Sequence, residues 1–284
     1  MPARLIDGRA HARAIQEELK HAVETSANQR PPGITVIQVG DDPASTTYVR
    51  GKNRSAEDVG FKSAIEHFHT ITQRGLHERL ARLAGDPSVD GILLQLPLPD
   101  GLNADQALEQ IPPHKDVDGL HPYNAGRLAQ GHPTFVPATP LGVLELLRRE
   151  HIDPTGKHAV VVGRSRLVGR PLALLLLQNH ATVTITHSQT TDLPTITKTA
   201  DILVGATGKR GLITGDHVRP GAVVIDVGIT RDPETGKLTG DVDRATVEAV
   251  ASGLTPVPGG VGPMTIAMLL VNTYRAYRQH IGQA

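Results

Sequence analysis

The sequence predicts an α/β protein of two domains, each a mainly parallel sheet flanked by helices. Short apolar runs alternate with amphipathic helical patterns, and strands separated by helices form right-handed βαβ units. The alternation begins afresh near Lys157, and 284 residues exceed a single domain of about 150 residues. We therefore expect one domain over residues 1–139 and a Rossmann-like domain over residues 140–264. A helix over residues 265–284 is expected to pack back on the first domain.

The first domain contains three strand-like runs that alternate with helical patterns. The expected strands cover residues 34–39, 62–69 and 91–99. The expected helices cover residues 9–27, a segment that starts at Pro43, and residues 76–83. Apolar residues at steps of three and four indicate the first helix, and prolines end the third strand. A turn-rich connection over residues 111–140 then leads to a helix over residues 141–150.

The second domain repeats this rhythm with four short runs that are rich in β-branched residues, as buried parallel strands are. These strands are expected over residues 158–162, 181–186, 202–205 and 222–227. An apolar helix over residues 172–177 follows the first of them, and residues 265–274 are apolar enough for a buried helix. This order of elements is typical of a dinucleotide-binding fold.

Composition excludes several classes of function. Lys and Arg balance Asp and Glu at 29 each, so no net charge favours nucleic acid or an anionic membrane as a partner. The chain has no Cys, which excludes disulfides, thiolate catalysis and cysteine-bound metals. We expect no metal site, because His67 and His69 fit the two-residue alternation of a strand. Without a signal peptide or a membrane-spanning run, we expect a soluble cytoplasmic protein.

The helix after the first strand carries polar side chains on one face. Asp42 suits the N-cap and Pro43 the first turn, so the start of the helix is defined. Ser45, Tyr48 and Lys52 then fall at i, i+3 and i+7, on the same side. Open α/β sheets bind ligands beyond the carboxyl ends of their strands, where an amine is useful for moving a proton. A solvated helix explains the same residues and is the simpler interpretation of these residues alone.

Residues 163–171 lie between a strand and an apolar helix. Small residues there let the backbone approach a phosphate, and the helix start supplies free amides. The motif departs from G-x-G-x-x-G, because Ser165 replaces the middle glycine and the closing Gly169 comes one residue late. A nucleotide site and a structural turn therefore both remain open.

The end of the next strand indicates which dinucleotide would bind. NAD sites usually place an acid there for the ribose hydroxyls. This strand ends in Thr186, His187 and Ser188, without an acid. Arg164, His187 and Ser188 are able to donate hydrogen bonds to a 2′-phosphate, so the pattern favours NADP over NAD. The alternative is that His187 and Ser188 only begin a polar loop.

Three more segments place constrained or polar residues where strands end. Residues 255–265 are rich in Gly and Pro, which shapes backbone against a flat ring or a phosphate; a hinge is the alternative. Gln95 interrupts an apolar strand and needs a partner, either structural or in a cleft beside Lys52. Asp118 lies on a turn of the kind that is most often solvated. Alternatively, its carboxylate pairs with an amino-pyrimidine edge.

Six motifs together resemble one family. They are Tyr48-Val49-x-x-Lys52, Gln95-Leu96-Pro97-Leu98-Pro99, Lys115-Asp116-Val117-Asp118-Gly119, Pro137-x-Thr139-Pro140, Gly163-Arg164-Ser165-x-x-Val168-Gly169-x-Pro171 and residues 256–265. In this order, along most of the chain, they resemble the bifunctional methylenetetrahydrofolate dehydrogenase/methenyltetrahydrofolate cyclohydrolase family.

The resemblance implies a homodimer that binds a folate between a catalytic domain and an NADP domain. It implies NADP-dependent oxidation of 5,10-methylenetetrahydrofolate to 5,10-methenyltetrahydrofolate, then hydrolysis to 10-formyltetrahydrofolate. Lys52 is expected to be the central catalytic group, with Gln95 holding it. Tyr48 is expected to stack near the pterin and Asp118 to anchor it. The other implied contacts are those of Gly163, Arg164, Ser165, Ser188 and Ile229 with NADP, and those of Pro258 and Gly259 with the substrate.

The sequence departs from the family pattern at three positions. Ala138 and Thr186 stand where Cys is common, and Arg54 stands where Lys is frequent. None of these changes removes a proton-handling group, although Ala138 alters the fit around the folate.

Two rival functions predict different behaviour. Another two-domain NADP dehydrogenase, acting on a small acid or amino acid, leaves Gln95 and Asp118 unexplained. A dinucleotide-binding regulatory module without turnover leaves the pair of Tyr48 and Lys52 unexplained.

Overall fold

The structure, a computed structural model, describes residues 2–26, 30–232 and 235–283. The chain forms two compact units. We call residues 1–12 with 139–265 the Rossmann-like unit, and residues 13–138 with 266–284 the Lys52 unit. Helices α1 (Gly8–Thr25) and α10 (Val261–His280) each begin in the first unit and continue in the second.

The Lys52 unit is built on a three-stranded parallel sheet in the order β3-β2-β4. The strands are β2 (Gly33–Val39), β3 (Lys62–Phe68) and β4 (Gly91–Leu94). The helices between them are α2 (Pro43–Asp58) and α3 (Gln73–Gly85), and α4 (Ala104–Leu108) and α5 (Pro122–Ala129) follow β4. Because β2 is central, the chain adds β3 on one side of it and β4 on the other.

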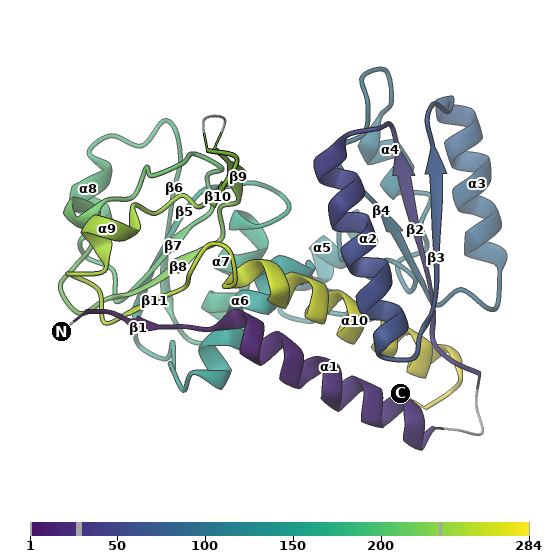
Figure 1. Cartoon of the computed structure of the whole chain (residues 1–284), viewed down its shortest axis with the longest axis horizontal. Coiled ribbons are helices and arrows are strands. Elements are labelled where there is room, and N and C mark those ends of the chain that lie inside the picture. The colour runs from purple at the N-terminus through teal and green to yellow at the C-terminus, as the bar shows by residue number, and fades with distance from the viewer. Residues whose placement is uncertain (1, 27–29, 233–234, 284) are drawn as a thin grey trace. The chain divides into compact units, whose positions relative to one another are not determined.

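The two faces of β2 pack on different helices, because side chains alternate along a strand. Ile37 belongs to an apolar cluster that includes Leu80 of α3. Gln38 points to the other face, where its Nε2 donates to Oγ1 of Thr46 in α2 at 2.7 Å. Figure 1 shows α2 and α3 on opposite sides of this sheet.

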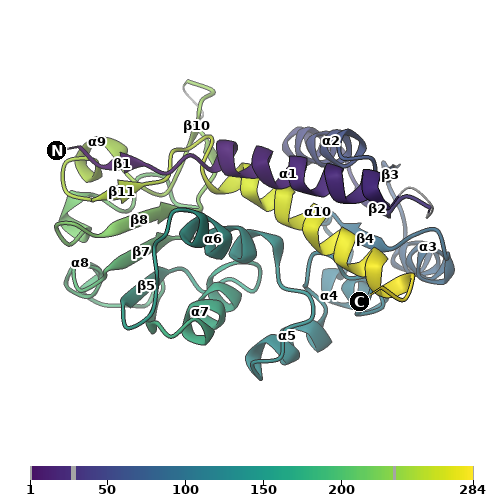
Figure 2. The ribbon, with the colours of Figure 1, turned by 90° about the horizontal axis from the view of Figure 1, so that it is seen from below.

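Helices α1 and α10 run side by side through the Lys52 unit in both ribbon views (Figures 1 and 2). The hydroxyl of Tyr274 in α10 donates to the backbone oxygen of Ala22 in α1 at 3.4 Å. Residues 266–284 therefore belong with the segment that contains Lys52.

The Rossmann-like unit is built on a six-stranded, fully parallel sheet in the order β1-β11-β8-β7-β5-β6. Its strands are β1 (Arg4–Leu5), β5 (His158–Val162), β6 (Thr182–Thr186), β7 (Ile202–Gly205), β8 (Val223–Asp226) and β11 (Gly253–Leu254). Its helices include α6 (Ala138–Arg149), α7 (Gly169–Gln178), α8 (Leu193–Thr197) and α9 (Arg244–Val247). The chain places β6 and β7 on opposite sides of β5, so a switch point lies at the carboxyl end of β5.

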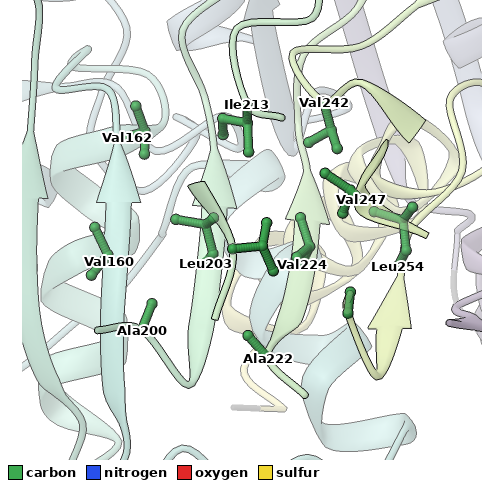
Figure 3. Packing of buried hydrophobic residues seen from close by; sticks show 12 residues of the cluster. Val160, Val162, Ala200, Leu203, Ile213, Ala222, Val224, Val242, Val247 and Leu254 are labelled. Carbon is green, nitrogen blue, oxygen red and sulfur yellow. The ribbon is translucent and has the colours of Figure 1, made fainter. Parts of the chain in front are cut away.

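One face of this sheet carries the apolar cluster shown in Figure 3. Val160, Leu203 and Val224 come from three neighbouring strands, and Val247 of α9 packs with them. Burying each such side chain contributes roughly 1.5–3 kcal/mol. The β-branched runs that indicate strands in the sequence thus also supply the core.

Several expected boundaries in the sequence are wrong; the helices expected from residues 141 and 172, for example, begin three residues earlier, at Ala138 and Gly169. The strand expected over residues 91–99 ends at Leu94, because Pro97 and Pro99 have no amide to donate to a sheet. The last helix begins at Val261, four residues before its expected start at Thr265. The third helix starts earlier than expected, at Gln73, because the hydroxyl of Thr72 accepts from Gly75 N at 3.1 Å.

Several short elements were not expected. The turn-rich connection over residues 111–140 contains α5, whose N-cap is His121 and whose first turn contains Pro122. The first twelve residues group with the Rossmann-like unit rather than with residues 13–138, because β1 pairs with β11. The other unexpected elements are β9 (Thr230–Arg231), β10 (Leu238–Thr239), α4, α8, α9 and the short helix Gly215–His217. Ala27, expected to end the first helix, lies outside the described residues.

No helix in the described part of the chain has both the length and the apolar character needed to cross a membrane.

Candidate active site

The start of α2 sets which of its side chains are buried. The carboxylate of Asp42 accepts from the backbone N–H of Ser45 at 2.8 Å, and Pro43 occupies the first turn, as the sequence predicts. The helix then carries Tyr48 half-buried and Lys52 buried, with 7% of Lys52 exposed. Lys52 is therefore a buried amine on a helix that is otherwise largely polar.

The candidate site lies at the carboxyl edge of the three-stranded sheet. β2 leads into α2, and β4 ends one residue before Gln95. A parallel bridge between Ile92 and Asp116 brings a further segment alongside β4, and Asp118 follows it. Since β3 and β4 flank β2, this edge is a switch point, where open α/β sheets bind ligands.

The amine of Lys52 is held by two neighbours. Its Nζ donates to Oε1 of Gln95 at 3.0 Å and lies 4.6 Å from the centre of the Tyr48 ring. Nε2 of Gln95 donates to the backbone oxygen of Leu96 at 2.7 Å, which fixes the orientation of the amide. Burial lowers the pKa of Lys52 below its ordinary value, while the negative charge of Asp118 opposes this shift. An amine in this environment is suited to gain and lose a proton.

Asp118 has the opposite shift. Burial raises the pKa of Asp118 to about 6, while the positive charge of Lys52 lowers it and the carboxylate of Asp116 raises it further. The backbone amide of Ala138 also stabilises the charged form. Titratable groups whose pKa values are shifted by burial and by a charged neighbour are typical of functional sites.

The turn after β5 is tightly packed around two glycines. Gly163 has φ +129, and a Cβ atom there would lie 2.1 Å from the backbone oxygen of Ala206. A Cβ atom at Gly169 would lie 2.0 Å from the oxygen of Gly163. The hydroxyl of Ser165 accepts from the N–H of Val168 at 3.1 Å, so this side chain orders the start of α7. The turn thus brings bare backbone and a helix start to the switch point of the six-stranded sheet.

The other expected dinucleotide contacts lie where neighbouring strands end. Arg164 and Ser188 are exposed, and Ile229 is 50% exposed. Nδ1 of His187 accepts from the N–H of Gln189 at 3.2 Å, so one ring nitrogen is used by the turn. These residues follow β5, β6 and β8, at the same edge of one parallel sheet.

The Gly- and Pro-rich loop packs on the start of α1 within the Rossmann-like unit. Pro258 is exposed, whereas Gly259 is buried with φ +111. The oxygen of Gly259 accepts from the N–H of Arg9 at 2.9 Å, and a Cβ atom at Gly8 would lie 1.9 Å from the oxygen of Gly260. The density of Gly and Pro therefore serves close backbone packing.

Two family models match the chain. The tetrahydrofolate dehydrogenase/cyclohydrolase catalytic domain matches residues 6–118, and the NAD(P)-binding domain of the same family matches residues 137–281. The chain belongs to the tetrahydrofolate dehydrogenase/cyclohydrolase family. This confirms the family indicated by the six motifs and the two-domain α/β class.

Relatives match nearly the whole chain. A bifunctional protein FolD from Synechococcus sp. (strain RCC307) is 52% identical over 282 residues, 98% of this chain and 96% of that protein. The structure of a bifunctional FolD from Campylobacter jejuni has a TM-score of 0.95 at 47% identity, covering 98% of this chain and 99% of that one. A FolD from Trypanosoma brucei, complexed with NADP cofactor and inhibitor, has a TM-score of 0.95 at 40% identity, with 99% of each chain covered.

The sequence does not identify the residues that hold the Asp118 loop, although Asp116 belongs to one of the six motifs. The buried carboxylate of Asp116 accepts from Leu120 N at 3.2 Å, His121 N at 2.8 Å and Asn124 Nδ2 at 2.8 Å. The oxygen of the Asn124 amide accepts in turn from the hydroxyl of Thr134 at 2.7 Å. The pKa of Asp116 is raised by burial, although these donors oppose the shift. Asp116 therefore acts as a structural anchor two residues from Asp118.

Helix α10 holds the same loop from another side. Nδ2 of buried Asn272 donates to the backbone oxygens of Val117 at 2.8 Å and Val136 at 3.0 Å. A Cβ atom at Gly119 would lie 2.5 Å from the carbonyl carbon of Val136. The backbone on both sides of Asp118 is thus fixed. Asn272 is a polar residue within an apolar run of sequence, and the same kind of signal identified Gln95.

Asp226 fixes the loop that carries Ile229. Its carboxylate accepts from the backbone N–H groups of Gly228 at 3.0 Å, Asp241 at 2.9 Å and Val242 at 3.0 Å. Burial raises the pKa of Asp226 to about 7, while these hydrogen bonds lower it. The expected NAD(P) contact at Ile229 therefore rests on a buried carboxyl that the sequence analysis did not single out.

A cavity of about 430 Å³ is lined in part by Asp226, and its lining residues lie between positions 210 and 257 of the sequence. Its lining includes Arg210 and Arg244, which form ion pairs with Asp232 and Glu248. With both cations engaged, the cavity presents no clear anion site, and we assign no ligand to it.

Two of the three departures from the family pattern, Thr186 and Ala138, lie at buried positions. Thr186 is 1% exposed, and its hydroxyl has no hydrogen-bond partner among the described residues. Ala138 is 2% exposed at the start of α6. The unpartnered hydroxyl at Thr186 fits a position at which the family often uses a thiol, because a thiol is a weaker hydrogen-bonding group.

We expect Gly163→Ala to weaken dinucleotide binding more than about tenfold. The new methyl group would meet the oxygen of Ala206, and φ +129 is unfavourable for any residue with a Cβ atom, at a cost of about 1–3 kcal/mol. Fluorescence titration with NADPH measures the change. Gly156→Ala is the control, since Gly156 has φ +70 but no atom within 4 Å of an added Cβ. Equal NADPH affinity of the Gly163→Ala protein and the parent would contradict the packing argument.

Proposed function

We propose that the chain oxidises 5,10-methylenetetrahydrofolate with NADP and then hydrolyses 5,10-methenyltetrahydrofolate to 10-formyltetrahydrofolate. The observation that carries the proposal is the buried amine of Lys52. Gln95 accepts a hydrogen bond from this amine, and the charge of Asp118 partly offsets the lowering of its pKa by burial. Family membership and full-length similarity to bifunctional relatives support both activities. Both family domains are needed, because one is the catalytic domain and the other is the NAD(P)-binding domain that holds the hydride acceptor.

In the first step, the protein mainly orients the reactants. Bound NADP supplies the hydride acceptor. The Asp118 carboxylate would accept two hydrogen bonds from the amino-pyrimidine edge of the pterin, and the Tyr48 ring would stack against it. This fixes the methylene carbon for hydride transfer, which moves no proton to the protein. Loss of Lys52 should therefore affect this step less than the next.

In the second step, Lys52 would move protons. Water adds to the carbon of the methenyl cation, and the neutral amine of Lys52 accepts a proton from that water. The hydroxyl of this adduct then loses its own proton as the bond from the carbon to N5 breaks, N5 takes the proton that Lys52 had accepted, and the formyl group stays on N10. One proton is released overall, which balances the positive charge of the substrate. That charge also lowers the pKa of Lys52 further while the substrate is bound.

We propose NADP rather than NAD as the preferred dinucleotide. β6 is followed by His187 and Ser188 instead of an acid, and Arg164 is exposed after β5. These groups are able to donate to a 2′-phosphate, whereas a carboxylate would repel it. The structure of the Trypanosoma brucei relative with NADP supports this choice.

One assay tests the proposed function. Methylenetetrahydrofolate and NADP are supplied together, and reduced nicotinamide and the methenyl chromophore are followed in the same sample. We expect NADPH to accumulate while the methenyl signal rises and then decays; NAD in place of NADP should give a lower kcat/KM. NADPH formation without decay of the methenyl signal would show that the chain does not hydrolyse methenyltetrahydrofolate. Dinucleotide binding without any turnover would instead support a regulatory module.

We expect kcat/KM for the folate substrate to fall as the pH drops through about 6. Burial raises the pKa of Asp118 to about 6, so Asp118 loses its charge below this pH and no longer accepts two hydrogen bonds. Initial rates from pH 5 to pH 8, at saturating NADP, measure this fall, which is the acidic limb of the pH–rate profile. In Asp118→Asn the limb should disappear, together with most of the activity. A limb that persists in this variant would assign the titration to another group.

The resemblance further implies a homodimer, and we include a homodimer and a cytoplasmic location in the proposal. Light scattering coupled to size exclusion measures the oligomeric state of the whole chain.

A further inference from the structure

A cluster of two imidazoles and one carboxylate lies at the exposed end of β2 and β3. Asp41 follows β2, His67 lies in β3, and His69 follows β3. Each offers one ligand atom, and these atoms all lie within 4.8 Å of one another. We propose that Asp41, His67 and His69 bind a divalent transition metal that favours imidazole, such as Zn²⁺ or Co²⁺.

The register of the sheet brings the three residues together. Gln38 pairs with His67, and Val39 pairs with Phe68. The chain therefore leaves β2 at Asp41 close to the point where it leaves β3 at His69. The two-residue spacing puts both imidazoles on one face, and their ring centres are 4.8 Å apart. From the sequence alone the two histidines fit an ordinary strand, because the third ligand comes from another strand.

The distances are close to those of a metal site. Oδ1 of Asp41 lies 2.7 Å from Nδ1 of His69 and 3.1 Å from Nε2 of His67. Ligands about 2.0–2.1 Å from a tetrahedral metal are separated by about 3.3 Å. All three side chains are partly or largely exposed, with 62%, 33% and 77% of Asp41, His67 and His69 accessible, so small rotations are enough. The oxygen of Gly40, 2.9 Å from Nε2 of His67, adds a further oxygen nearby.

Metal binding at this site would act on the start of α2. Asp41 directly precedes Asp42, whose carboxylate caps the helix that carries Tyr48 and Lys52. A metal bound by Asp41, His67 and His69 would tie Asp41, the residue before the N-cap Asp42, to the end of β3. The first turn of α2 should then open less often.

The test is a titration of the whole chain with Co²⁺, followed by its visible absorption, with displacement by Zn²⁺. We expect saturable binding of a single Co²⁺ by the parent. Binding should weaken by at least about tenfold in His69→Ala and in Asp41→Asn. His21→Ala is the matched control, because His21 is an exposed histidine on α1. Its Co²⁺ affinity should equal that of the parent.

Hydrogen exchange gives a second readout. Zn²⁺ should slow exchange of the amides of residues 44–48 in the parent and leave them unchanged in His69→Ala. Two results would overturn the proposal. One is Co²⁺ affinity that is the same in His69→Ala and the parent, and the other is no saturable binding by the parent. Because all three ligands are exposed, the variants should fold as the parent does, which far-ultraviolet circular dichroism verifies.

Discussion

Replacing Lys52 with Met is expected to reduce the hydrolysis of methenyltetrahydrofolate by about 10²–10⁴-fold, while NADP affinity stays unchanged. Met has nearly the same length as Lys, so the 7% exposed site stays filled while the titrating amine is lost. Removing a buried amine with a lowered pKa costs no favourable charge interaction with water. The change should therefore act on proton transfer more than on folding. Decay of the methenyl chromophore measures the hydrolysis, and NADPH titration measures binding.

The ratio of the two activities separates this role from a general loss of function. Hydride transfer moves no proton to Lys52, so the dehydrogenase rate should fall much less than the hydrolase rate. Arg54→Met is the control on the same helix, because 85% of the Arg54 side chain is exposed. It should leave both activities near those of the parent. Undiminished hydrolysis in Lys52→Met would remove Lys52 from the proton-transfer role.

The sequence predicts those parts of the site that depend on local chemistry. Asp42 and Pro43 define the start of α2, and the helical spacing then places Tyr48 and Lys52 together. Gly163 is also recognisable, because a turn between a strand and an apolar helix requires unusual backbone. In each case the residues that reveal the feature lie close in the sequence to the residues that they position.

The parts that the sequence does not predict depend on contacts between distant segments. The grouping of residues 1–12 depends on a two-residue pairing of β1 with β11, which carries almost no pattern of its own. The cluster at Asp41 depends on the register of β2 and β3. Such pairings are decided by tertiary packing, which no local pattern encodes.

The same limit applies to the support of Asp118. Its motif is visible in the sequence, but the side chain that fixes the loop comes from Asn272, in the last helix. The apolar run around Asn272 indicates a buried helix, and a buried amide must find partners. The sequence therefore shows that partners exist, and the structure identifies them as the oxygens of Val117 and Val136.

We expect Asn272→Leu to raise the KM for the folate substrate at least about tenfold, which corresponds to about 1.4 kcal/mol of binding free energy. Leu is a good helix former of similar size, so α10 should persist. The oxygens of Val117 and Val136 would lose a buried donor, at a cost of about 1–3 kcal/mol each. The Asp118 loop should then relax away from the position that matches the pterin. Steady-state kinetics with varied folate, and denaturant unfolding, measure the two effects.

A positioning role and a purely structural role predict different kinetics. If Asn272 only stabilised the fold, folded Asn272→Leu protein at low temperature would keep the parental KM for folate. If it positions Asp118, the folate KM rises while the Kd for NADPH stays constant, since Val117 and Val136 both lie in the Lys52 unit. Gln279→Leu makes the same amide-to-Leu change at an exposed position of α10 and should alter neither quantity. A lower unfolding free energy with an unchanged folate KM would show that the contact from Asn272 serves stability alone.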